Sequence, residues 1–88
     1  MTVRLSTGEV TRRLHLAMDA ARSLPLGDLE QVENLIQVGE QRVAFENLCA
    51  QIYEYDVRLP LYLRALLAET GQQLGVAPRY WELLEGSG

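Results

Sequence analysis

The amino-acid sequence predicts an all-α fold, a compact bundle of four to five helices. Apolar residues recur at steps of three and four along most of the chain, and no segment keeps the strict alternation typical of a strand. Proline or glycine lies between these periodic segments, where helices start and stop. The 88 residues suffice for one domain. We expect a single helical domain over residues 1–85, followed by a flexible tail over residues 86–88.

The first two helices are predicted over residues 8–24 and 28–38. Ser6 begins a capping-box pattern, and Pro25 ends the first helix because proline disfavours helical backbone in the residue before it. Gly39 has the placement of a C-terminal cap for the second helix. The apolar stripes predict two buried faces: Val10, Leu14, Ala17, Met18, Ala21 and Leu24 in the first helix, and Leu29, Val32, Leu35 and Ile36 in the second.

The third helix, predicted over residues 40–55, has two distinct faces. At 100° per residue, one side gathers the apolar residues Ala44, Phe45, Leu48, Cys49 and Ile52. The other side carries a mixed set, Val43, Glu46, Asn47, Ala50, Tyr53 and Glu54. A helix of this length spans about 24 Å, comparable to the width of a small domain. It can therefore bury one face and present the other across the whole molecule.

The last two helices are predicted over residues 60–74 and from Pro78 to Leu84. Pro60 suits a first helical position, and Gly75 closes the fourth helix. Gly71 lies inside this helix and costs about 1 kcal/mol relative to alanine, which leaves a kink or an early end open. The apolar residues are Leu63, Leu66, Leu67, Thr70 and Leu74 in the fourth helix, and Tyr80, Trp81, Leu83 and Leu84 in the last.

Acidic residues are concentrated in one part of the chain. Residues 28–56 carry seven acids against one arginine, a net charge of −6, whereas the remaining residues carry five acids against seven arginines, a net of +2. Such a region repels nucleic acid and attracts a basic protein. The order of helix, glycine and helix around Gly39 is typical of a helix-turn-helix motif. The recognition helix of such a motif, however, would begin with Glu40 and contain Arg42 as its only basic residue. We therefore expect no nucleic-acid partner.

Residues suited to catalysis or metal binding are few. His15 is the only histidine, and we expect it to be exposed beside Asp19 one turn away; Cys49 is the only cysteine and has the placement of a small core residue. One histidine and one cysteine cannot form a zinc site, and the acids lack the spacing of a calcium loop. We expect no enzyme activity, no metal and no cofactor. With no apolar run of about 20 residues and no signal peptide, the simplest expectation is a cytoplasmic protein with no membrane partner.

Two runs of residues carry a family resemblance. The first includes the pair Gly39-Glu40, then Ala44-Phe45-Glu46, Leu48-Cys49 and the acidic and aromatic residues that end at Asp56. The second is Tyr80-Trp81-Glu82-Leu83-Leu84. Both resemble segments of the Maf-type immunity proteins of bacteria, and the likeness extends from Leu35 to Asp56 and over the final helix. The resemblance implies a small cytoplasmic helical protein that binds the toxic domain of a polymorphic or contact-dependent toxin, often an RNA-cleaving one.

The outer side of the third helix is the expected partner surface. Toxic nucleases have basic clefts for their phosphate substrates, and an acidic helix face can occupy or flank such a cleft. One aromatic anchor among small apolar contacts and acids is typical of an interface. The expected partner-binding residues are Glu40, Val43, Glu46, Ala50, Tyr53, Glu54 and Asp56.

Two other functions remain open. The first is a self-associating structural or regulatory module, a homodimer that buries Val43, Ala50 and Tyr53 against a second copy of the chain. The second is a small enzyme that relies on His15 or on the acidic residues. Sedimentation distinguishes the first from a one-to-one toxin complex, and substitution of His15 and Cys49 tests the second.

Overall fold

Helices account for the regular secondary structure of the computed structural model, which describes the backbone of residues 4–86 and the side chains of residues 4–82 and 84. In chain order they are α1 (Thr7–Ala20), α2 (Leu26–Gln37), α3 (Gln41–Glu54), α4 (Leu61–Leu74) and α5 (Pro78–Gly86). The described residues contain no strand. The predicted all-α fold is confirmed.

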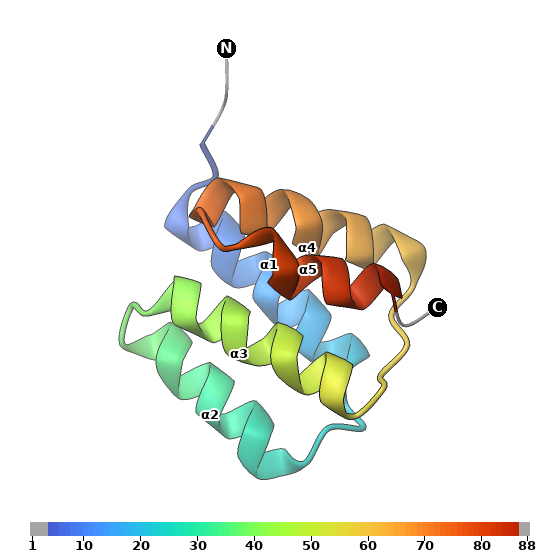
Figure 1. Cartoon of the computed structure of the whole chain (residues 1–88). Helices are drawn as coiled ribbons and strands as arrows, with labels where there is room; N and C mark the ends of the chain where they lie inside the picture. The colour runs from blue at the N-terminus through green and yellow to red at the C-terminus, as the bar shows by residue number, and fades with distance from the viewer. Residues whose placement is uncertain (1–3, 87–88) are drawn as a thin grey trace.

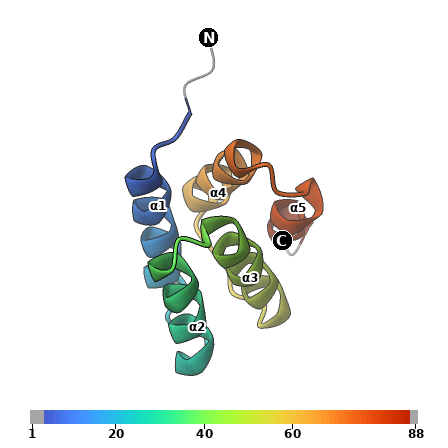
Figure 2. The ribbon, with the colours of Figure 1, turned by 90° about the vertical axis from the view of Figure 1, so that its left-hand side faces the viewer.

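Helix α3 lies at the centre of the bundle. It packs against each of the other four helices, most extensively against α2 and α5, while α1 packs against α4 and α4 against α5. Figure 1 shows α2 on one side of α3 and the α4–α5 pair on the other, with α1 behind. In the rotated view of Figure 2, α3 again lies between α2 and α5. This arrangement leaves one side of the central helix open between two neighbours.

The core consists of the apolar stripes predicted from the helical periodicity. All five residues of the predicted inner face of α3 are at most 2% exposed. Among the described residues, Phe45 has the largest fully buried side chain. The other predicted stripes are buried or partly buried where their side chains are described: Val10, Leu14, Ala17, Ala21, Leu24, Val32, Ile36, Leu63, Leu67, Thr70 and Leu84 are buried, and Met18, Leu29, Leu35, Leu66, Leu74, Tyr80 and Trp81 pack partly buried against them.

The boundary between α1 and α2 differs from the prediction. Helix α1 ends at Ala20, four residues before the expected end, and Ala21 leaves helical geometry with φ −106° and ψ 35°. The chain uses residues 21–25 to reverse direction, and α2 begins at Leu26 directly after Pro25, whose ψ of 140° caps it. Proline disfavours helical backbone in the residue before it but not in the residue after it, so α2 can start two residues earlier than expected. Leu24 is still buried, but from the connection rather than from the helix.

The C-terminal half contains one close helix–helix contact. Helix α4 continues past Gly71 to Leu74, so the early end that the glycine left open does not occur. Gly71 is buried because Trp81 of α5 and Phe45 of α3 lie against its backbone. Helix α5 reaches Gly86, the first residue of the expected tail, and residues 87–88 lie outside the described residues.

Polar side chains join the helices around the core. Arg13 of α1 donates hydrogen bonds to the Glu69 carboxylate at 2.8 Å and to the Thr70 hydroxyl at 3.2 Å, both on α4. Gln41 of α3 donates to the Thr7 carbonyl of α1 at 2.9 Å. These contacts fix the directions of α3 and α4 relative to α1. Among the described residues, no helix has both the length and the hydropathy to cross a membrane.

Candidate functional site

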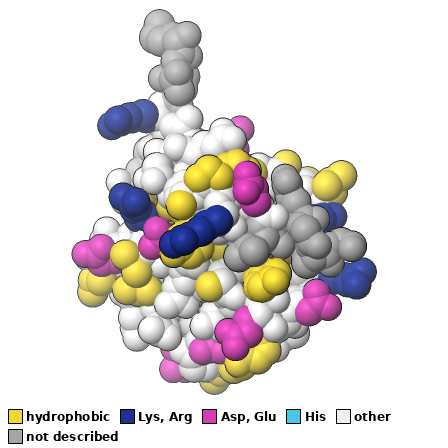
Figure 3. All heavy atoms as spheres, in the orientation of Figure 1, with side chains coloured by type: hydrophobic (Ala, Val, Ile, Leu, Met, Phe, Trp, Pro, Cys, Tyr) yellow, Lys and Arg dark blue, Asp and Glu magenta, His cyan; other side chains and the backbone are white. Residues whose placement is uncertain are grey.

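The open side of α3 carries the residues predicted to face a partner. Val43 is 42% exposed and Tyr53 is 51% exposed, and Ala50 and Glu54 are also exposed. Glu46 is half-buried, with 26% of its side chain exposed. We call these five residues, Val43, Glu46, Ala50, Tyr53 and Glu54, the α3 strip. Figure 3 shows the face of the molecule that carries α3 and α5, where acidic and hydrophobic side chains lie interspersed.

A hollow of about 310 Å³ lies between the N-terminal half of the α3 strip and α5. Val43, Glu46 and Ala50 of the strip line it, as do two amide residues of α3, Asn47 and Gln51, and the aromatic ring residue Tyr80 of α5. The prediction did not include the amides or Tyr80 among the site residues. No local pattern could have brought Tyr80 to α3, because the two segments are far apart in the sequence and meet only through the packing of α5 against α3. We call this site the α3–α5 hollow.

The polar side chains of the α3–α5 hollow are one carboxylate, two amides and one phenol hydroxyl, and the carboxylate has no internal hydrogen bond. The Glu46 carboxylate lies 3.8 Å from Arg42 Nε, an ion pair too long for a hydrogen bond. Asn47 Oδ1 is buried and accepts no hydrogen bond from any described residue. A buried polar atom without a partner costs about 1–3 kcal/mol of stability. No lysine or arginine is among the described residues that line the hollow.

The two ends of α3 hold the remaining predicted residues. Glu40 is exposed at the N-terminal cap and forms no side-chain capping bond. Asp56 follows the C-terminus with a φ of 51°, in the left-handed region that favours glycine. Its N–H donates to the Tyr53 carbonyl at 3.1 Å, and the next N–H, of Val57, donates to the Ile52 carbonyl at 2.9 Å, which together form a Schellman motif. The structure therefore brings only Val43, Glu46 and Ala50 into one hollow and spreads the other four predicted residues along the helix and its ends.

Exposed apolar and aromatic side chains missed by the prediction lie beyond the C-terminus of α3. Tyr55 is 51% exposed, Leu61 is 74% exposed and Tyr62 is 68% exposed. Leu61 and Tyr62 are the first two residues of α4 and lie outside its buried stripe. Their departure from the helical periodicity of the apolar residues was the signal in the sequence that they would be exposed. Figure 1 shows the connection that runs from the end of α3 to the start of α4, and Tyr55, Leu61 and Tyr62 lie at its two ends.

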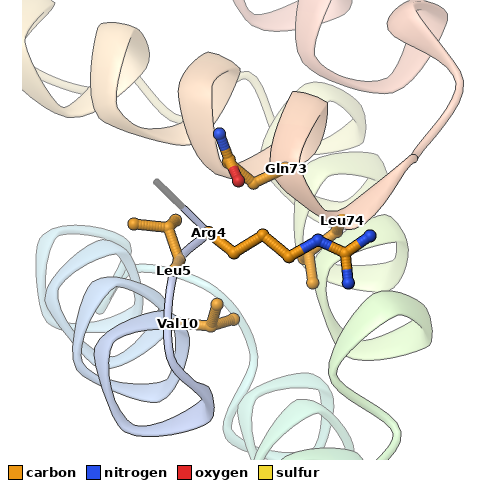
Figure 4. A pocket seen from close by; sticks show the side chains of 5 residues that line it. All are labelled: Arg4, Leu5, Val10, Gln73 and Leu74. Atoms are coloured by element: carbon orange, nitrogen blue, oxygen red, sulfur yellow. The ribbon is translucent and has the colours of Figure 1, made fainter. Parts of the chain in front are cut away.

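A second hollow of about 310 Å³ lies between the N-terminal segment, α1 and α4, and its lining has a different charge. Arg4, Leu5, Val10, Gln73 and Leu74 line it, from the N-terminal segment, α1 and α4. Figure 4 shows the Arg4 side chain extending toward Leu74. Among the described residues, its lining contains a cation and no acid, and it includes none of the predicted partner-binding residues.

His15 and Cys49 are both held by structural contacts. His15 Nε2 lies 3.0 Å from the Glu33 carboxylate of α2, so its partner is Glu33 and the prediction of Asp19 is wrong; helix packing, rather than the spacing along α1, decides the contact. Cys49 is fully buried, and burial raises the pKa of its thiol to about 12. Among the described residues, no three His, Cys, Asp or Glu side chains come together as a metal-binding group.

This chain matches no protein-family model, no curated protein and no solved structure. The resemblance to the Maf-type immunity proteins therefore stays a prediction that rests on the residues quoted for it.

Proposed function

We propose that this chain is an immunity protein that binds a cognate bacterial toxin, a basic and RNA-cleaving protein, through the α3 strip. The observation that carries the proposal is the division of the central helix into a fully buried face and an open face of acidic, aromatic and small apolar side chains. The family resemblance of the same helix supports it. In this mechanism the protein occupies or flanks the catalytic cleft of the toxin and performs no chemistry on it.

The composition of the α3 strip fits a basic partner. Glu46 and Glu54 supply negative charge, and Glu40 and Asp56 add to it at the two ends of the helix. Complementary charge of this kind accelerates association and excludes partners of the wrong sign. Tyr53 provides a half-exposed aromatic ring of the type that most often dominates the binding energy of an interface.

The strip belongs to a helix that is held firmly. Contacts with all four other helices fix α3, so its outer side chains are presented on a backbone that need not be ordered upon binding. A preorganised surface loses less conformational entropy in a complex and therefore binds more tightly. A typical interface uses roughly 20–30 residues on each side. The α3 strip, the α3–α5 hollow and the exposed tyrosines beyond α3 together supply the centre of such a surface.

A co-expression rescue tests the proposal. The gene immediately upstream of this chain is read first; if it encodes a large secreted protein, the C-terminal domain of that protein is expressed in a bacterial host with and without the chain, and growth is measured. We expect the domain to stop growth and the chain to restore it. Inhibition that the chain does not relieve contradicts immunity, as does the absence of a toxic domain.

A matched pair of charge reversals then tests the surface. Glu54→Arg changes an exposed acid within the α3 strip, and Asp19→Arg makes the same charge change at an exposed position of α1. We expect Glu54→Arg to weaken toxin binding at least about tenfold, which corresponds to about 1.4 kcal/mol, and Asp19→Arg to leave it nearly unchanged. Equal effects of the two variants would place the interface elsewhere.

Sedimentation of the pure protein tests the homodimer hypothesis in the same preparation. The toxin proposal expects a monomer that forms a one-to-one complex. A concentration-dependent dimer that Tyr53→Arg dissociates would instead show that the α3 strip is covered by a second copy of the chain.

A further inference from the structure

We propose that the α3–α5 hollow binds a single arginine side chain of the partner protein. This inference rests on the proposed function, because it names the side chain through which a basic partner would engage the α3 strip. Three features of the hollow carry it: a carboxylate that no internal hydrogen bond satisfies, two neighbouring side-chain amides without side-chain hydrogen bonds, and apolar walls.

The carboxylate and the amide oxygens of the hollow suit a ligand that donates several hydrogen bonds. Glu46, Asn47 and Gln51 provide one carboxylate and two side-chain amides, and none of the three has a side-chain hydrogen bond to another described residue. Asn47 Oδ1 is buried without a hydrogen-bond partner, so of the two amides Gln51 is the one whose oxygen a ligand would reach without a change of side-chain conformation. A guanidinium has five N–H donors in a planar fork, so it can pair with a carboxylate through two of them and still donate to a neighbouring amide oxygen.

The walls of the hollow fit the rest of an arginine side chain. Val43 and Ala50 are small apolar residues, and Tyr80 contributes an aromatic ring from α5. The methylene groups of a long basic side chain bury readily against such surfaces while its charged end reaches a polar group. Lysine fits less well, because its ammonium is a compact and strongly hydrated charge that cannot pair with two acceptors in a plane.

Two arginines of the chain itself lie at the rim and determine how the site should respond to substitution. Arg42 Nε is 3.8 Å from the Glu46 carboxylate, and 61% of the Arg42 side chain is exposed. Arg42 therefore competes for Glu46 without satisfying it. The Arg79 guanidinium lies 5.1 Å from the centre of the Tyr80 ring and holds this wall of the hollow through a cation–π contact. Removal of Arg42 should accordingly strengthen binding of an external arginine, and neutralisation of Glu46 should weaken it.

The test uses a small probe, so it is independent of any toxin. Nα-acetyl-arginine methylamide is titrated into the full-length ¹⁵N-labelled protein, and amide shifts are followed by NMR, with the matching lysine derivative as the control ligand. We expect saturable shifts centred on the Asn47 side-chain amide, Ala50 and Tyr80, and weaker binding of the lysine probe.

Substitutions at the rim sharpen the test through effects of opposite sign. Glu46→Gln should weaken binding of the arginine probe about tenfold, Arg42→Gln should strengthen it, and Glu54→Gln, a matched neutralisation outside the hollow, should change it less than about twofold. Shifts that do not saturate, equal binding of lysine, or equal effects of Glu46→Gln and Glu54→Gln would each overturn the arginine site.

The two proposals fail in different ways. If the chain rescues growth and Glu54→Arg abolishes rescue, but the arginine probe does not bind, the immunity function stands and the assignment of the hollow is wrong. If the probe binds as expected but no toxin is neutralised, the arginine site stands and the partner belongs to another class of protein.

Discussion

Substitution of Gly71 by alanine should destabilise the protein, although helix propensity alone favours the change. Alanine inside a helix is about 1 kcal/mol more favourable than glycine. At Gly71, however, a Cβ atom would overlap the Trp81 ring and would approach Phe45 Cζ to 2.9 Å. Phe45 is fully buried and α5 is held over this position, so neither ring can move without a loss of packing.

The magnitude follows from these opposing effects. Overpacking of a core by one methyl group costs typically 1–3 kcal/mol, and a clash with two aromatic rings belongs at the upper end of that range. After the gain in helix propensity, we expect a net loss of about 2 kcal/mol, which lowers the melting temperature by roughly 8–16 °C in a domain of this size. Thermal unfolding followed by circular dichroism measures this shift.

Gly27→Ala is the matched control. Gly27 lies in α2, and a Cβ atom there would meet nothing within 4 Å. This variant should be more stable than the original protein by roughly 0.5–1 kcal/mol. Trp81 is the only tryptophan, so its fluorescence reports directly on α5, and we expect a red shift in Gly71→Ala alone. A Gly71→Ala variant as stable as Gly27→Ala, with unchanged fluorescence, would refute the proposed contact between α4 and α5.

Two further variants test the ends of helices. Asp56→Gly should raise the free energy of unfolding by about 1 kcal/mol in urea denaturation, because the φ of 51° suits glycine and strains aspartate; a loss of stability would contradict this. Hydrogen bonds from Arg12 and then Arg13 lower the pKa of Glu9 to about 2. Since this folded-state pKa lies below the ordinary value of 4.5, the ionised carboxylate stabilises the fold above pH 4.5, and the contribution is lost as the pH falls toward 2. Glu9→Gln should therefore be less stable than the original protein at pH 7, and the difference should shrink as the pH falls from 4.5 through 2; a difference that does not shrink over this range would show another cause.

The sequence was sufficient to predict the faces of the helices because burial there follows a local repeat. The inner face of α3 is the clearest case: every predicted core residue is buried, and Val43, Ala50 and Tyr53 are exposed as expected. The predicted end of α1 was wrong, because apolar residues keep their helical spacing up to Leu24 although the helix ends at Ala20. Periodicity reports which residues are buried, and it does not report whether a buried residue belongs to a helix or to the connection after it.

The position of α5 could not be predicted, since it depends on contacts between distant segments. Gly71 has no local signature of a packing site, and its role is visible only when Trp81 lies against it. The same contact places Tyr80 beside α3 and so completes a hollow of which the sequence indicated only one wall. Glycine at position 71 lowers the helix propensity of α4, but its lack of a side chain leaves room for α5 to pack against this helix.

This dependence links the stability of α5 to the binding site. Trp81 Nε1 is buried without a hydrogen-bond partner where α5 meets α4, and Asn47 Oδ1, on a residue that lines the α3–α5 hollow, is also buried without one. Each unsatisfied group costs about 1–3 kcal/mol of stability. A donor from a partner that reached Asn47 Oδ1 would remove one of these penalties, so binding in the α3–α5 hollow would stabilise the bundle. The partner side chain would then complete the bundle as well as contact it, and Glu46 beside Asn47 selects a cationic donor for that place.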